Sequence, residues 1–314
     1  MIGYERVKLG ENKLWIGGYG PERSSHGVGL ATFKRIMEAE TNGEVTVDIT
    51  WNIMDEGRPN THLFELVEAG EMFFCYFSTS YQGRRVPELN VLETPFLFDN
   101  LEMAHSALDG ALGDRLRDAV RRSTGFELLG CWDNGYRHFT NRLRPVRDPE
   151  DCKGMTVRMQ PNEVHEALIR SWGAEPVAVE LSEAIRLISN LEVDAQENPL
   201  ANTVAYDVHK VHSHYTMTGH LYGARGLFAH RATFESLATD IREIAARAVR
   251  EAISTQRSEA SKLEVRLRER LESEGANFVD LTEEERLGFI SASAPAISLA
   301  HQGVPEELFE LARP

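Results

Sequence analysis

Long apolar runs are missing from this 314-residue chain, and their absence excludes a membrane-spanning helix. The longest apolar stretches, such as Met72–Phe77, fall well short of the roughly 20 residues that a helix needs to cross a bilayer. Gly/Ser-rich, Pro-rich and homopolymeric tracts are missing as well. With 42% hydrophobic and 26% charged residues, the composition is that of a folded, soluble globular protein.

Basic residues are few compared with acidic ones. The chain has 34 Lys and Arg against 49 Asp and Glu, a net charge of −15 and a sequence pI near 5.2. This balance argues against nucleic acid or an anionic membrane surface as a partner, because both require a basic face. A small anionic ligand would need a pocket that is locally positive.

Cysteine is scarce, and the recognised signatures of catalysis are absent. Cys75, Cys131 and Cys152 have no C-x-x-C spacing and cannot all pair, so we predict three buried, reduced thiols. Four histidines lie within twelve residues but lack H-E-x-x-H or a matching Cys/His spacing. No G-x-S-x-G elbow, phosphate-binding loop or dinucleotide fingerprint is present. We therefore predict no metal, no cofactor and no enzymatic activity.

The beginning of the chain carries no secretory signal. Its first residues, MIGYE, lack the basic start and the apolar stretch of such a leader. Two interpretations stay open: the protein is cytosolic, or its leader has been removed.

Periodicity predicts alternating helices and strands in about two domains. Such alternation favours α/β layers with parallel sheets. A segment without Pro or Gly predicts a very long helix over 233–274, with no sustained heptad repeat. Helices are expected over 25–42, 60–69, 102–122, 162–172 and 182–189, and strands over 44–50, 126–132, 155–159 and 176–179.

Two polar segments are candidates for binding loops at strand ends, where the ligands of open α/β sheets lie. The first, 132–141, contains Arg137; the alternative is a surface turn with Arg137 in solvent. The second, 193–199, contains Asn198 before Pro199; the alternative is an ordinary turn.

Arg158 lies inside a strand-like run, where an arginine needs a partner. Its planar guanidinium matches a carboxylate through two hydrogen bonds, so it suits recognition of an organic acid. The alternative is an internal salt bridge to Asp or Glu.

Several segments resemble, in order and spacing, the motifs of one protein family. In the middle of the chain these are GYRHFTN, PEDCKGMTVRM, GAEPVAVELSEAI and VDAQENPL. Nearer the front, SSHGVGLATFKRIMEAETNGEVTVDI and VPELNVLETPFLFDNLEMA resemble its first helix with the following strand and its proline-containing crossover. The family is that of TRAP transporter periplasmic solute-binding proteins, also called the DctP-like family.

The resemblance implies a two-lobed periplasmic-binding-protein-like α/β fold, with a ligand cleft between the lobes and a long bridging helix. Lobe I would comprise 1–134 and about 223–263, and lobe II about 135–222 and 264–314. The protein would be a periplasmic monomer that captures a small organic carboxylate and delivers it to the membrane subunits of a TRAP transporter. The alternatives are an enzyme or a ligand sensor that uses the same fold on an organic acid.

The resemblance also assigns the site. Arg158 would hold the ligand carboxylate, and Arg137 and Asn198 would complete the anion site. First-lobe contacts would come from His26, Ser78 and Tyr81.

Departures from the family pattern bear on the ligand. Leu181 stands where some relatives place an aromatic residue against sugar acids, and Ala195 replaces a usual glycine. Because Ser78 and Tyr81 offer hydroxyls rather than a second cation, a compact monocarboxylate is slightly favoured over a dianion.

Overall fold

A computed structural model describes residues 13–313 of the chain. The described residues form two compact units, each assembled from three segments of the chain. The first unit contains 13–77, 113–133 and 225–260, and the second contains 78–112, 134–224 and 261–313. Segment 78–112 therefore lies in the second unit, whereas the predicted boundaries put it in lobe I. Ser78 and Tyr81 consequently belong to the same unit as Arg158.

The first unit is built on a sheet in which β1 is parallel to both of its neighbours. Its strands are β1 (Lys13–Gly17), β2 (Thr46–Thr50), β3 (Phe74–Ser78), the 126–133 part of β4 (Phe126–Asn141) and the 225–230 part of β8 (His214–His230). Its helices are α1 (Ser25–Glu40), α2 (His62–Glu68), most of α4 (Ala111–Ser123), α8 (Arg231–Ser236) and the 239–260 part of α9 (Thr239–Ser273).

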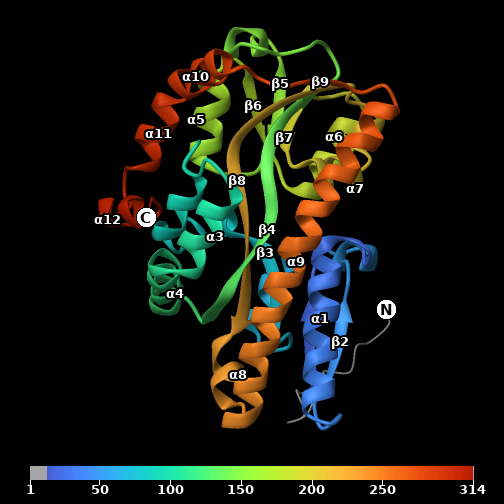
Figure 1. Cartoon of the computed structure of the whole chain (residues 1–314), viewed down its shortest axis with the longest axis vertical. Helices are drawn as coiled ribbons and strands as arrows, with labels where there is room; N and C mark the ends of the chain where they lie inside the picture. Colours follow the sequence, from blue (N-terminus) through green and yellow to red (C-terminus); the bar gives the residue numbers. More distant parts are fainter. Residues whose placement is uncertain (1–12, 314) are drawn as a thin grey trace. The chain divides into compact units, whose positions relative to one another are not determined.

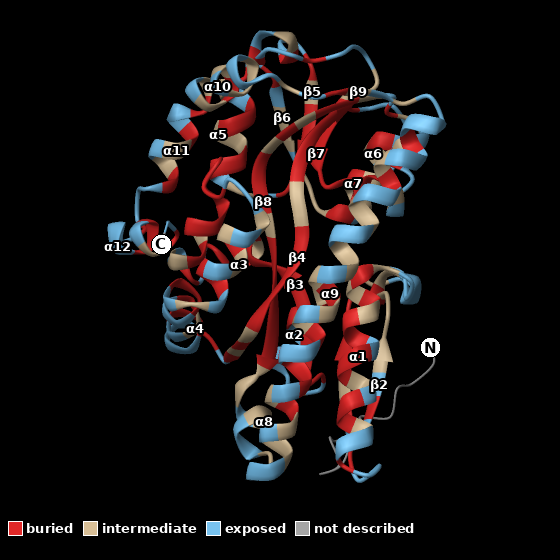
Figure 2. Ribbon diagram, viewed as in Figure 1, coloured by how far each residue is buried: buried red, intermediate tan, exposed pale blue. Residues whose placement is uncertain are grey.

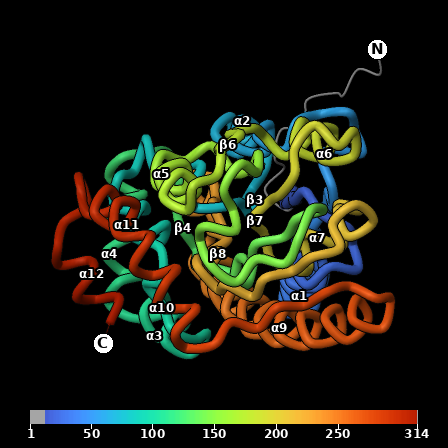
Figure 3. Tube along the Cα trace, turned by 90° about the horizontal axis from the view of Figure 1, so that it is seen from above, coloured from blue at the N-terminus to red at the C-terminus, as the bar shows by residue number. Residues whose placement is uncertain are grey.

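Helix α1 shows how the sequence determines this unit. The Ser24 side chain caps the helix by accepting a hydrogen bond from Gly27 N at 3.0 Å. The apolar residues at helical spacing, Leu30, Phe33 and Met37, are fully buried, and Phe33 packs edge-on against Phe74. Figure 2 shows this buried stripe on α1, which lies beside β2 (Figure 1) and α9 (Figure 3).

The second unit is built on a mixed sheet. Strand β7 is antiparallel to β4 and parallel to β5, so the predicted parallel pairing is present together with antiparallel pairing. Its strands are the 134–141 part of β4, β5 (Thr156–Met159), β6 (Glu175–Ala178), β7 (Ala195–Asn198), the 214–224 part of β8 and β9 (Asn277–Val279). Its helices include α3 (Leu101–Asp109), α5 (Glu163–Ser171), α6 (Leu181–Ser189), α7 (Leu200–Ala205), α10 (Glu283–Ala292), α11 (Ala294–Ala300) and α12 (Glu306–Leu311).

Helices cover both faces of β5 and β7. Figures 1 and 3 show α5, α10 and α11 on one side of these strands and α6 and α7 on the other. The first side holds a large apolar core in which Val157 and Met159 of β5 pack with Leu168, Trp172 and Phe289. Strand β7 is buried along its whole length (Figure 2).

Four local predictions were wrong. The segment 132–141 is not a loop, because β4 continues to Asn141, and 193–199 contains β7. Both segments are rich in polar residues whose side chains are buried and hydrogen-bonded, which hides the strand pattern. The expected helix over 102–122 is two helices that meet at Gly110. The expected helix over 233–274 is divided into α8 and α9 near Leu237, whose backbone is extended.

The three cysteines are buried and free, as predicted. Among residues 13–313, no three His, Cys, Asp or Glu side chains are placed to hold a metal ion. The helices of that same part of the chain include none that is long and apolar enough to cross a membrane.

Glu264, on the part of α9 in the second unit, carries a buried carboxylate oxygen, Oε1, without a hydrogen-bond partner. Its nearest ionisable partner is His138, whose Nε2 lies 3.9 Å from that oxygen. Burial lowers the pKa of His138 to about 3, so this ring is neutral at pH 7 and supplies no compensating charge. Burial therefore raises the pKa of Glu264 from 4.5 to about 7, despite a hydrogen bond from the Leu200 backbone.

This shift makes stability depend on pH. A carboxyl group whose pKa is higher in the folded state does not lower the free energy of unfolding below pH 4.5. As pH rises from 4.5 to about 7, it lowers that free energy progressively. A Glu264→Gln variant should therefore be more stable than the wild type by about 1–3 kcal/mol at pH 8, and equally stable near pH 4.5. Urea denaturation at both pH values measures the difference. Glu269→Gln, at an exposed position of the same helix, is the control; equal effects of both variants would contradict the prediction.

Candidate ligand-binding site

Strand pairing places the key polar residues on two opposite faces of the second unit's sheet. Arg158 of β5 is in register with Gln196 of β7, so both side chains point to the same face, together with Asn198 two residues on. Phe139 of β4 pairs with Glu197, so these two side chains point to the other face of the sheet. Arg137, two residues before Phe139, points to that face as well. The two predicted arginines therefore lie on different faces of one sheet.

Arg158 is a buried cation that no carboxylate neutralises. Only 2% of the Arg158 surface is exposed to solvent. Its Nη2 donates to Val179 O at 3.0 Å, and its Nε is buried without a hydrogen-bond partner. Burial lowers the pKa of Arg158, but an arginine stays protonated in proteins. The alternative of an internal salt bridge is thus not realised for Arg158 in the described part of the chain, and its charge is available for an anion.

Arg137 is neutralised by Glu197 instead. Its Nη2 donates to Glu197 Oε1 at 2.7 Å and to Glu197 O at 2.6 Å, and its Nε donates to Glu197 Oε2. Arg137 is 3% exposed, so the alternative of an arginine in solvent was wrong. A contact between Arg137 and the ligand stays a prediction; in the structure its guanidinium holds Glu197.

Glu197 is the centre of a buried polar network that sequence reasoning missed. Burial alone would raise the pKa of Glu197, but the Arg137 charge, the hydrogen bonds from Arg137 and the nearby His220 ring hold it far below its usual range. His220 Nε2 lies 3.5 Å from Glu197 Oε2, and His220 Nδ1 lies 2.6 Å from Thr218 Oγ1. Burial lowers the pKa of His220, and its buried Nε2 faces Glu197 without a well-formed hydrogen bond.

A second buried carboxylate, Glu93, belongs to the same unit. Its Oε2 lies 2.8 Å from His165 Nε2, and its Oε1 accepts from Thr79 Oγ1 at 3.2 Å. In the sequence, only the position of Glu197 beside Asn198 in the segment VDAQENPL indicated a functional role for it. Nothing in the sequence indicated a role for Glu93. The Arg137–Glu197 and Glu93–His165 contacts lie within the protein and fix the positions of these side chains.

Asn198 belongs to a chain of amides on the Arg158 face. Its Nδ2 donates to Gln196 Oε1 at 3.3 Å, and its Oδ1 accepts from Asn202 Nδ2 at 3.0 Å. Gln196 in turn donates to Thr203 Oγ1 at 3.1 Å. Asn198 is thereby held in one orientation in the same unit as Arg158.

The hydroxyl side of the site comes from the end of β3. Ser78 and Ser80 lie 2.9 Å apart, and both donate to Gln160 Oε1, at 3.3 and 2.8 Å. Because Gln160 comes directly after β5, two residues beyond Arg158, this contact joins the serine pair to the end of the strand that carries Arg158. Tyr81 is half-buried, and its hydroxyl is hydrogen-bonded to Glu180. Leu181, the first residue of α6, is buried in the same unit.

His26 is the one predicted site residue in the first unit. Its ring stacks on Tyr76 with centroids 4.7 Å apart and is tilted against Trp132. Burial, followed by the charge of Arg225, lowers the pKa of His26 to about 3, so the ring is neutral. Its Nε2 is buried without a hydrogen-bond partner.

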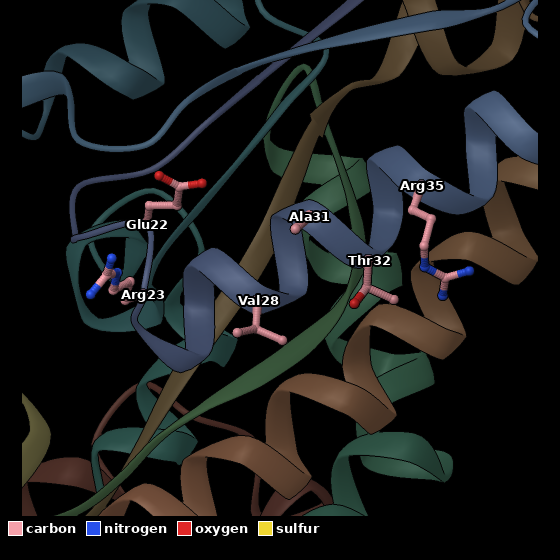
Figure 4. Close-up of a pocket in the computed structure, with 6 residues that line it drawn as sticks. All are labelled: Glu22, Arg23, Val28, Ala31, Thr32 and Arg35. Carbon is pink, nitrogen blue, oxygen red and sulfur yellow. The ribbon is translucent and has the colours of Figure 1, made fainter.

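The surface of the first unit has a shallow hollow of about 470 Å³ beside α1. Figure 4 shows that the side chains around it come from α1 and the turn before it. It contains none of the predicted site residues, and both of its arginines are exposed. Its lining residues are Glu22, Arg23, Val28, Ala31, Thr32 and Arg35.

The two α/β units and the buried, unpaired arginine define the class as a two-lobed binding protein. The sequence profile of the DctP family, described as bacterial extracellular solute-binding protein, family 7, matches residues 16–302. The chain belongs to this family, which confirms the resemblance seen in its sequence.

Curated relatives match most of the chain. A solute-binding protein of Verminephrobacter eiseniae is 28% identical over 274 residues, covering 87% of this chain and 80% of the relative. The 2,3-diketo-L-gulonate-binding periplasmic protein YiaO of Escherichia coli is 27% identical over 258 residues, covering 82% and 77%.

Solved structures match the whole fold. A TRAP periplasmic solute-binding protein from Polaromonas sp. JS666, bound to D-erythronate, superposes with a TM-score of 0.89 at 26% identity, covering 96% of this chain and 98% of that one. A protein of the same kind from Shewanella oneidensis, with bound succinate, gives 0.89 at 25% identity, covering 96% and 98%. The predicted two-lobed α/β fold is confirmed.

The Arg137–Glu197 pair gives a prediction about stability. Glu197→Ala leaves the Arg137 charge buried and uncompensated, which should lower the free energy of unfolding by about 3–5 kcal/mol. The double variant Arg137→Met/Glu197→Leu removes both charges and should lose less than Glu197→Ala alone. Urea denaturation measures all three proteins.

Glu166→Ala is the control, because it breaks only an exposed ion pair with Arg170 and should cost less than about 1 kcal/mol. If Glu197→Ala is no worse than this control, the pair does not have the structural role assigned to it.

Proposed function

We propose that this protein is the periplasmic solute-binding protein of a TRAP transporter. It captures a small organic carboxylate, passes it to the membrane subunits of the transporter and does no chemistry on it. The observation that carries the proposal is the Arg158 guanidinium, which is buried without a carboxylate partner. A buried charge is costly unless it is paired, and a ligand carboxylate would pair it.

The charge balance of the site favours a ligand with one carboxylate. Arg137 is cancelled by Glu197, so Arg158 is the one cation of this pair of arginines that is left to bind an anion. A second carboxylate on the ligand would therefore have neither of these two arginines as its partner. Relatives of known structure hold both kinds of acid, D-erythronate with one carboxylate and succinate with two.

The buried groups around Arg137 support binding rather than catalysis. Glu197 is held ionised by Arg137, and His220 is held neutral by burial, so neither has a pKa suited to exchanging protons near pH 7. Incubation with the bound acid should therefore leave that acid intact by mass spectrometry. A contact between His26 and the ligand stays a prediction.

The test starts from a thermal-shift screen of organic acids, because a ligand at 100-fold above its dissociation constant adds about 2.7 kcal/mol of stability. Titration calorimetry with the best acid then compares variants. Arg158→Ala should lose about 2–5 kcal/mol of binding free energy, because a desolvated charge pair is removed. Arg158→Lys should recover only part of it, since a point charge cannot form the two parallel bonds.

Arg170→Ala is the control, an exposed arginine of α5 in the same unit. Affinity of Arg158→Ala within about threefold of the wild type would rule out Arg158 as the carboxylate contact.

A further inference from the structure

Glu180 is a carboxylate beside the free cation, yet the two form no ion pair. Arg158 donates to the carbonyl of Val179, the residue directly before Glu180. No ion pair within 4.0 Å joins Arg158 to Glu180 or to any other acidic side chain among residues 13–313. Glu180 precedes α6, but its side chain makes no capping hydrogen bond to that helix. Its carboxylate is thus not used by the helix that follows it.

One oxygen of Glu180 lacks a hydrogen-bond donor. The residue is half-buried, and Oε2 is out of contact with solvent and has no partner. Burial raises the pKa of Glu180, and the hydrogen bond from Tyr81 and the charge of Arg158 only partly oppose this. A buried acceptor without a donor is unfavourable by about 1–3 kcal/mol, so a donor supplied by the ligand would be strongly preferred at this place.

We propose that Glu180 is a specificity-determining residue, whose Oε2 accepts a hydrogen bond from a hydroxyl or ammonium group carried next to the ligand carboxylate that Arg158 binds. This inference rests on the proposed function and narrows the ligand class to monocarboxylates with a neighbouring hydrogen-bond donor. The Val179 peptide separates the two contacts, so the donor and the carboxylate of the ligand must be close together.

The same arrangement selects against two other kinds of acid. An unsubstituted acid leaves Oε2 buried and unpaired, and sites with an unpaired polar group reject analogues that lack the matching donor. A dicarboxylate brings a second negative charge toward Glu180, and like charges in a desolvated site repel strongly. Neither the serine pair nor Asn198 offers a substitute donor to Oε2, because both are hydrogen-bonded to amides.

The experiment uses acids of three to six carbons in matched sets. Each set contains the unsubstituted acid, its 2-hydroxy, 3-hydroxy and 2-amino forms, and the dicarboxylate of the same length. Thermal shift identifies the set that binds, and calorimetry measures the affinities. We expect the wild type to prefer a donor-bearing acid over the unsubstituted one by at least about tenfold. The hydroxy and amino arms show which donor the site takes.

Two variants separate the acceptor from the charge. Glu180→Ala should reduce the donor preference to less than about threefold. Glu180→Gln keeps an acceptor oxygen without the charge, so it should keep a hydroxyl preference, lose an ammonium preference and bind the dicarboxylate better than the wild type does. Glu183→Gln, on the same helix and paired with Arg186 at the surface, is the control and should leave every affinity unchanged.

The outcomes distinguish this inference from the proposed function. If no acid binds the wild type, the proposed function fails and this inference with it. If acids bind through Arg158 but the wild type does not discriminate, or Glu180→Ala keeps the full discrimination, the proposed function stands and the role of Glu180 is overturned.

Discussion

The positive charge of the Arg158 guanidinium, which no carboxylate among residues 13–313 pairs, is the constraint on which the site depends. The protein carries a net charge of −15, so carboxylates are plentiful, yet none of those in the described residues forms an ion pair with Arg158. Burying a charge without a partner is unfavourable. The unpaired guanidinium can form its ion pair with the carboxylate of a ligand, as a receptor for an anion requires.

The rest of the second unit keeps Arg158 free. The strand register sends Arg137 and Glu197 to one face of the sheet, where they neutralise each other within a core closed by α5, α10 and α11. It sends Arg158, Gln196 and Asn198 to the other face, where amides fix one another. Glu197 is therefore hydrogen-bonded to Arg137, the arginine on its own face of the sheet, and forms no ion pair with Arg158. The alternation of side chains along β4, β5 and β7 therefore separates the Arg137–Glu197 ion pair from Arg158.

The sequence predicted much of the fold and only part of this chemistry. Helices such as α1 and α5 were predictable because their apolar spacing and capping residues are local. The 133–141 part of β4 and the strand β7 were mistaken for loops, since some of their polar residues are satisfied by partners far away in the chain, as Arg137 is by Glu197, 60 residues distant. Whether each arginine forms an ion pair could not be predicted from the sequence either. Ion pairing depends on which face of the sheet a side chain occupies and not on its neighbours in sequence. Segment 78–112 lies in the second unit, whereas the predicted boundary placed it in lobe I.

A crystal structure with the acid that gives the largest thermal shift tests the account most directly. The account predicts both carboxylate oxygens of the ligand at about 2.7–2.9 Å from guanidinium nitrogens of Arg158, with the Arg137–Glu197 pair unchanged. A ligand whose carboxylate lies on other groups, while Arg158 still donates only to Val179 O, would contradict the claim that this charge is kept for the ligand.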